Sequence, residues 1–152
     1  MYQRILVPVD GSETSRKGLA EAVKLASVTG GQLRLLHVVD ELAAAMGMSS
    51  DGGISANVFD LLKQGGEQVL AEGVALAQAQ HVVVDTLLIE GFSGRLSDHV
   101  AEQAGLWGAE LVVLGSHGRR GVGRMVMGSD AEQIIRSSPV PVLVVRAADP
   151  PQ

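Results

Sequence analysis

The chain has 152 residues and a formal net charge of -5, with 17 acidic against 12 basic side chains. This length suits one domain with one core, and the negative balance disfavours nucleic acid or an anionic membrane as the main partner. The absence of cysteine excludes disulfides, thiolate metal sites and cysteine nucleophiles. Apolar residues make up 46% of the chain and aromatic residues only 3%, so we expect an aliphatic core like that of a helix-covered parallel sheet.

The first third of the chain predicts a strand, a helix and a second strand. The run Arg4–Val9 is apolar and short enough for a buried strand. Ser12 is a suitable N-cap for the helix that follows, and Gly30 with the next glycine is a suitable stop. The second strand is expected over Gln32–Val39.

A long loop and a second helix are expected next. Residues 40–56 are rich in glycine and serine and show no periodicity, which indicates a loop. A helix is predicted from Val58 to Gln80. Its expected apolar stripe is Val58, Leu61, Leu62, Val69 and Leu76. We expect the glycines at 65, 66 and 73 to weaken this helix, each by about 1 kcal/mol relative to alanine.

The rest of the chain continues the alternation of strands and helices. The expected elements are a strand at Val82–Glu90, a helix at Ser93–Trp107, a strand at Ala109–Gly115, a helix at Ser129–Ser137 and a strand at Pro139–Val145. No two strands are close enough in sequence for a hairpin, so right-handed crossovers and a mostly parallel five-stranded sheet are predicted. With no signal segment and no apolar run of about 18 residues, a cytoplasmic protein is expected.

Two segments are candidates for a ligand site. In open α/β sheets, ligands bind beyond the carboxyl ends of the strands, at the point where the strand order reverses. If the first strand lies beside the fourth, that crevice is lined by VPVDGS (Val7–Ser12) and GSHGRRG (Gly115–Gly121). The second segment opens a glycine-rich basic loop that runs to Asp130. Because glycine lets main-chain N–H groups approach a ligand closely, phosphate is the first ligand to consider.

The glycine loop differs from two common phosphate-binding motifs. A Walker loop requires Gly-Lys-Ser or Gly-Lys-Thr, whereas Arg124 and Met125 follow Gly123. A dinucleotide fingerprint should follow the first strand and end in a third glycine, where this later loop has Val126. With these two motifs excluded, the loop is described by its own glycine spacing: Gly115, two residues, Gly118, nine residues, then Gly-Ser.

This spacing resembles the glycine signature of the nucleotide-binding branch of the universal stress protein family. The likeness extends over nearly the whole chain through three further segments, which stand in the same order as in that family. They are ILVPVDGSETS, LLHVVDE and SSPVPVLVV. The resemblance implies one universal stress protein domain over residues 1–146, followed by a short tail at 147–152. It also implies a doubly wound sheet of order 3-2-1-4-5 with helices on both faces.

The resemblance further implies an adenine nucleotide site for ATP, with Mg²⁺. The residues it assigns to the adenosine portion are Pro8, Val9, Asp10 and, through its backbone, Val38. Those it assigns to the ribose and phosphates are Gly115, Ser116, His117, Gly118, Arg119, Gly128, Ser129 and Asp130. A helix that starts at Ser129 supports the phosphate assignment, because free N–H groups and the helix dipole favour an anion there.

Four of these residues need further comment. Asp10 either binds the ligand, directly or through metal-bound water, or caps or begins the turn of the first helix. Ser116 and His117 are adjacent, so we expect their side chains to diverge, and no catalytic residue is assigned. Asp130 stands where many relatives have a small apolar residue; its carboxylate would either repel phosphate or recruit Mg²⁺.

The predicted function is a nucleotide-dependent regulatory or stress-response module with an unidentified protein partner. The alternatives are a slow ATP hydrolase or adenylate-transferring enzyme and, third, a dimerisation module that binds no nucleotide. We also expect a homodimer through the fifth strand, with Val140, Val142 and Val144 at the contact, since an apolar edge strand can pair with another chain. Nucleic-acid binding and membrane insertion are not expected.

Overall fold

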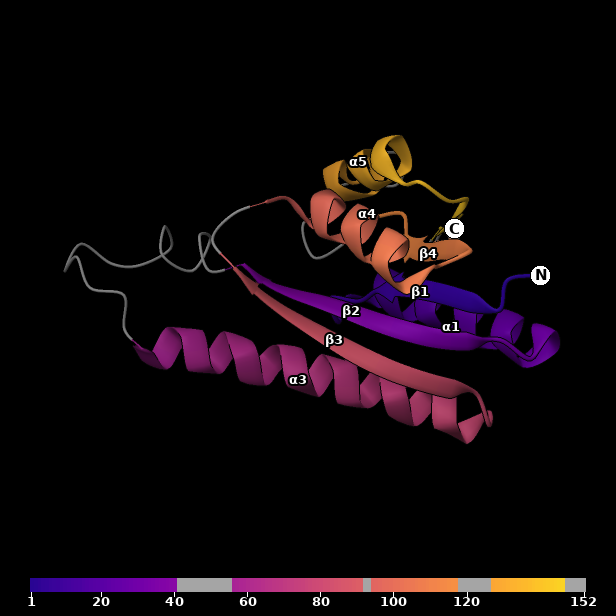
Figure 1. Ribbon diagram of the computed structural model, residues 1–152. Coiled ribbons are helices and arrows are strands. Elements are labelled where there is room, and N and C mark those ends of the chain that lie inside the picture. Colours follow the sequence, from indigo (N-terminus) through magenta and orange to yellow (C-terminus); the bar gives the residue numbers. More distant parts are fainter. Residues whose placement is uncertain (41–55, 92–93, 118–126, 147–152) are drawn as a thin grey trace, which may run out of the picture.

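The computed structural model describes residues 1–40, 56–91, 94–117 and 127–146. Its five strands are β1 (Arg4–Pro8), β2 (Gln32–Asp40), β3 (Val83–Gly91), β4 (Leu111–Gly115) and β5 (Val142–Val145). All neighbouring strands are parallel, and the order across the sheet is β3-β2-β1-β4-β5 (Figure 1). The predicted fold class and strand order are therefore confirmed.

Helices α1 (Glu13–Thr29) and α3 (Ala56–Ala79) cover one face of the sheet (Figure 1). The start of α1 is the predicted one, because the Ser12 side chain accepts a hydrogen bond from the Ser15 N–H at 3.2 Å. Its end is also as predicted, with Gly30 in the left-handed conformation at φ 72°. The core on this face consists mainly of aliphatic side chains from β1, β2, α1 and α3.

The predicted apolar stripe of α3 is wrong in part. Leu61 is 66% exposed and Leu76 is 40% exposed, whereas Leu70 and Ala77 are buried. The reason is that α3 lies close to the sheet through glycines: a Cβ at Gly73 would stand 2.5 Å from Cδ1 of Leu35. The glycines therefore face the sheet, and large residues such as Leu61 and Leu76 lie to the side of this contact.

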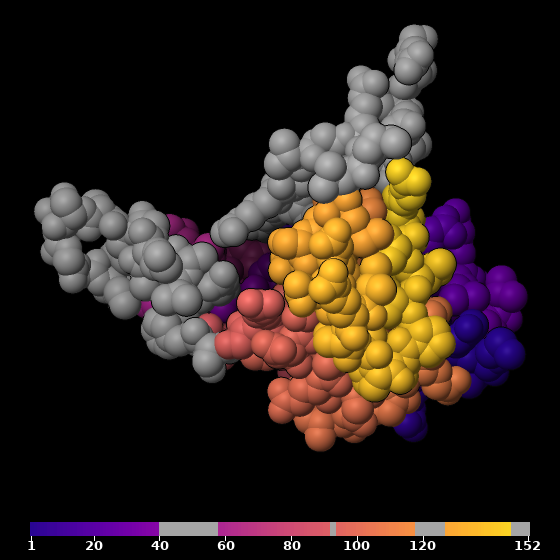
Figure 2. All heavy atoms as spheres, turned by 90° about the horizontal axis from the view of Figure 1, so that it is seen from above, coloured from indigo at the N-terminus to yellow at the C-terminus, as the bar shows by residue number. Residues whose placement is uncertain are grey.

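Helices α4 (Leu96–Trp107) and α5 (Ser129–Ser137) pack against each other and cover the opposite face. Figure 2 shows α4 and α5 side by side at the surface, with the end of the β5 segment next to them. The bounds of α5 are as predicted, whereas α4 begins three residues later than expected. Gly94 has φ 93° and Arg95 is extended, so neither can continue a helix backward.

The fifth strand is shorter than predicted because prolines precede it. Pro139 and Pro141 have no N–H to donate to the ladder, and β5 begins only at Val142. Pro141 still accepts a hydrogen bond from the Val112 N–H at 3.0 Å, so the chain already follows β4 there. Within the described ranges, no helix is both long enough and apolar enough to cross a membrane.

Candidate functional site

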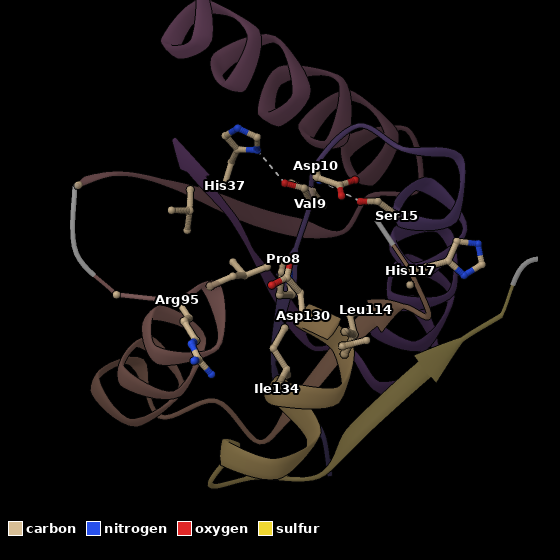
Figure 3. Close-up of a pocket in the computed structure, with 16 residues that line it drawn as sticks. Pro8, Val9, Asp10, Ser15, His37, Arg95, Leu114, His117, Asp130 and Ile134 are labelled. Carbon is tan, nitrogen blue, oxygen red and sulfur yellow. Dashed lines mark hydrogen bonds between the residues drawn. The ribbon is translucent and has the colours of Figure 1, made fainter. Parts of the chain in front are cut away.

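A pocket of about 390 Å³ lies at the carboxyl ends of the strands, where the strand order reverses between β1 and β4. Its walls come from the ends of β1, β2 and β4 and from the first turns of α4 and α5. Figure 3 shows its side chains, which converge from segments far apart in the sequence. This is the position that the topology of an open α/β sheet predicts for a ligand site.

One side of the pocket is an apolar slot. It is formed by Pro8, Val38, Leu96, Leu114, Ala131 and Ile134. Pro8, Val38 and Leu114 come from the sheet and the other three from α4 and α5, which cover this face; Ala131 and Ile134 are buried. An apolar slot between a sheet and two helices suits a flat apolar group such as an aromatic base.

The first turn of α5 contributes Asp130 and Ala131 to the wall of the pocket. Gly128 is the N-cap of α5 and supplies no side-chain acceptor to the first turn. The Gly128 N–H donates to the Ser116 carbonyl at 2.8 Å, which ties the helix start to the end of β4. Asp130, in the first turn, is exposed and lines the pocket, and Figure 3 shows its side chain among the lining residues.

The turn between β1 and α1 is held by its own side chains. The Asp10 Oδ1 accepts from the Ser12 N–H at 2.9 Å, and the Asp10 N–H donates to the Ser15 Oγ at 3.1 Å. Asp10 and Ser15 both line the pocket. Of the two interpretations of Asp10, the structure therefore shows the turn-forming one, and it also places this residue where a ligand would meet it.

Gly115 has a packing role that the sequence does not reveal. A Cβ at this position would stand 2.7 Å from both the carbonyl carbon and the carbonyl oxygen of Thr14. The end of β4 and the first turn of α1 thus meet backbone to backbone. This close approach brings the β1–α1 turn and the end of β4 to the same pocket.

The expected divergence of the Ser116 and His117 side chains is wrong. The Ser116 Oγ lies 3.0 Å from the His117 Nδ1, within hydrogen-bond distance. The pair meets because the strand has ended at Gly115 and no longer directs neighbouring side chains to opposite faces. Ser116 is only 6% exposed and does not line the pocket, whereas His117 does.

The structure brings together most of the residues predicted for the site. Those that line the pocket are Pro8, Val9, Asp10, Val38, Gly115, His117 and Asp130. Ser116 lies behind the wall, and Gly128 and Ser129 form the start of α5 without lining the pocket. Gly118 and Arg119 lie outside the described residues, as do the other loop arginines.

Sequence reasoning missed several other lining residues. They are Ser15, His37, Gly91, Gly94, Arg95, Leu96, Leu114, Ala131 and Ile134. Leu96 and Arg95 begin α4, and the loop before that helix carries no motif that marks it as part of a site. His37 had a usable signal, since it directly precedes Val38 at the end of a strand that borders the expected crevice.

No group of three or more His, Asp or Glu side chains gathers as a metal site in the part of the chain that the structure describes. The pocket does hold two carboxylates on its wall, those of Asp10 and Asp130. They come from different elements, the β1–α1 turn and α5. Hard cations such as Mg²⁺ bind oxygen ligands of this kind together with waters and substrate phosphates.

Comparison with known proteins agrees with the fold. Universal stress protein MJ0531 of Methanocaldococcus jannaschii is 30% identical over 146 residues, which cover 96% of this chain and 83% of that protein. The solved structure of protein MJ0577 superposes with a TM-score of 0.85 at 23% identity and covers 99% of each chain. A universal stress protein solved in complex with cAMP has a TM-score of 0.70 at 23% identity, with 97% of this chain and 99% of that one covered. The model of the universal stress protein family matches residues 1–146, and the chain therefore belongs to that family.

Proposed function

We propose that the pocket binds an adenine nucleotide, ATP with Mg²⁺, and that occupancy regulates an unidentified protein partner. One observation carries the proposal: the apolar slot and the start of α5 open onto one pocket at the strand-order reversal. A base fits the slot, and phosphates fit the helix start, whose free N–H groups and positive dipole end favour anions. Asp10 and Asp130 line the pocket, and we expect their carboxylates to accept hydrogen bonds from the waters of a phosphate-bound Mg²⁺.

Nucleotide binding by a structural neighbour supports this proposal. The cAMP complex shows that a protein of the same fold accepts an adenine nucleotide. For this chain we favour ATP over a cyclic nucleotide, because the sequence between β4 and α5 keeps the spacing of Gly115, two residues, Gly118, nine residues, then Gly-Ser. The cytoplasm is the compartment we propose for this activity.

A regulatory module is favoured over an ATP-hydrolysing enzyme. Ser116 and His117 are the described pair that most resembles a nucleophile and its base. A nucleophile must reach the reacting atom, yet the Ser116 side chain is buried and does not line the pocket. We therefore assign no catalytic role to this pair and expect bound ATP to be retained rather than rapidly turned over.

A blocked slot tests the proposed binding site. Leu96 is half-buried and lines the slot at the start of α4, so Leu96→Trp is expected to fill it with an indole ring. Calorimetric titration should show saturable Mg-ATP binding to the wild type and binding about tenfold weaker, or 1.4 kcal/mol, in the variant. Leu106→Trp on the same helix is the matched control, because Leu106 is 74% exposed and lies away from the pocket.

Two outcomes would contradict the binding site. If the wild type binds no adenine nucleotide, and mass spectrometry finds none released from the purified protein, the proposed function is wrong. If Leu96→Trp folds and binds Mg-ATP as tightly as the wild type, the nucleotide binds elsewhere.

We also propose a homodimer through β5, which is an edge strand of the sheet. Val140, Val142 and Val144 pack into the chain's own core, so pairing would rely on the strand edge and on Leu143, which is 41% exposed. Light scattering at micromolar concentration should give a dimer mass for the wild type and a monomer mass for Leu143→Arg. Val83→Arg, on the opposite edge strand, should leave the dimer intact, and a monomeric wild type would contradict the proposal.

A further inference from the structure

The ladder of hydrogen bonds between β1 and β2 ends beside the pocket. Its register runs from Arg4↔Gln32 to Pro8↔Leu36, and its last main-chain bond is from the Val9 N–H to the Leu36 carbonyl at 2.8 Å. Strand β2 continues beyond this point, paired only with β3 as far as Asp40↔Gly91. The pocket opens where β1 and β2 separate, so the manner in which the ladder ends shapes the site.

The next acceptor of the ladder, the Val9 carbonyl, is bonded by a side chain. In a parallel pair, alternate residues of one strand bond to the same neighbouring strand. After the Leu36 carbonyl, the next group of β2 to bond to β1 would therefore be the Val38 N–H, and its acceptor would be the Val9 carbonyl. Instead the His37 Nδ1 lies 2.8 Å from the Val9 oxygen (Figure 3). Over the described ranges, no main-chain bond joins Val38 to Val9. Because a carbonyl only accepts, the His37 Nδ1 carries the proton and donates it.

We propose that His37 is a positioning residue for base recognition, an inference that rests on the proposed nucleotide site and deepens it. By occupying the Val9 carbonyl, the imidazole ends the ladder and leaves the Val38 N–H and C=O directed toward the space between β1 and β2. One donor beside one acceptor matches the edge of adenine, which has a ring nitrogen next to an exocyclic amino group. Guanine presents the reverse order there, a carbonyl oxygen beside a ring N–H, and is selected against.

Helix α3 fixes the orientation of the His37 ring. A Cβ at Gly66 would stand 2.5 Å from the His37 Cδ2 and 2.9 Å from its Nε2, closer than real contacts allow. The ring is therefore confined between the Val9 carbonyl on one side and the α3 backbone on the other. This contact gives a reason for a glycine in the interior of a helix, where it lowers intrinsic helix stability.

The test separates the base from the phosphates by titrating each variant with adenosine and, separately, with tripolyphosphate. His37→Leu is expected to weaken adenosine binding about fivefold, the effect of one lost hydrogen bond of about 1 kcal/mol, and to leave tripolyphosphate binding unchanged. His37→Asn keeps an N–H donor near the Nδ1 position and should restore most of the affinity. Gly66→Ala should reproduce His37→Leu. The matched control Gly65→Ala, where a Cβ meets no atom within 4 Å, should behave like the wild type.

A second measurement follows the main chain without any ligand. With the Val9 carbonyl freed in His37→Leu, the Val38 N–H can bond to it, so NMR should show slower hydrogen exchange at Val38 than in the wild type. Equal adenosine affinity in a folded His37→Leu protein would overturn the inference, as would an equal loss of adenosine and tripolyphosphate binding, which marks a general structural role. Failure of the proposed function is distinguishable, because the wild type itself would then bind no adenine nucleotide.

Discussion

Gly115→Ala is expected to destabilise the protein by about 3 kcal/mol, at the upper end of the usual cost of overpacking a core. The added Cβ would stand 2.7 Å from the Thr14 carbonyl carbon and oxygen, which are backbone atoms and have no rotamer to change. Moving α1 away would also open a second close contact between α1 and β4, at Gly18, where a Cβ would lie 3.0 Å from the Gly115 nitrogen. Two glycines thus allow α1 and β4 to meet along their backbones.

Thermal unfolding measures this effect. For a chain of this size 3 kcal/mol corresponds to a fall in Tm of roughly 6–12 °C. Gly105→Ala is the matched control, because a Cβ there meets nothing within 4 Å and the exchange should stabilise α4 by about 0.5–1 kcal/mol. If Gly115→Ala unfolds at the wild-type temperature, the close packing of α1 on β4 is not required, and the glycine serves the ligand alone.

The fold could be predicted because its signals are local and repeated. Short aliphatic runs alternate with capped helical segments, and chain connectivity then leaves few arrangements of a parallel sheet. The buried face of α3 could not be predicted in the same way. Hydrophobic periodicity selects large side chains such as Leu61, whereas the observed contact line uses Gly66 and Gly73 because the sheet lies too close for a side chain there.

The site could be predicted where motif and topology coincide. Asp10 lies just beyond the end of β1 and Gly115 ends β4, and both line the pocket. Arg95 and Leu96 could not be found, because their place in the pocket depends on where α4 begins and how it packs against α5, which no sequence spacing encodes. His37 was not predicted for another reason. Its hydrogen bond to the Val9 carbonyl depends on the point at which the pairing of β1 with β2 ends, which the sequence does not specify.

Asp130 is expected to weaken the binding of metal-free ATP, and Asp130→Ala to tighten it. Its carboxylate lines the pocket at the α5 start, where the phosphates are proposed to bind (Figure 3). Two like charges about 5 Å apart repel by roughly 3 kcal/mol at an effective dielectric constant near 20. Because Asp130 is exposed, water and salt screen this repulsion. After allowing for this screening, we expect Asp130→Ala to bind metal-free ATP more tightly by about 2 kcal/mol at low salt, or roughly thirtyfold in affinity.

Titration with three ligands separates the possible roles of this carboxylate. Adenosine has no phosphate, so its affinity should be the same in the wild type, Asp130→Ala and the isosteric Asp130→Asn. Raising the salt concentration should reduce the gain for metal-free ATP, because screening weakens the repulsion in the wild type. If the carboxylate also holds the waters of Mg²⁺, both variants should bind Mg-ATP more weakly while they bind metal-free ATP more tightly. Wild-type affinities for all three ligands would contradict both roles and leave Asp130 with only the favourable interaction of an acidic side chain with the helix dipole.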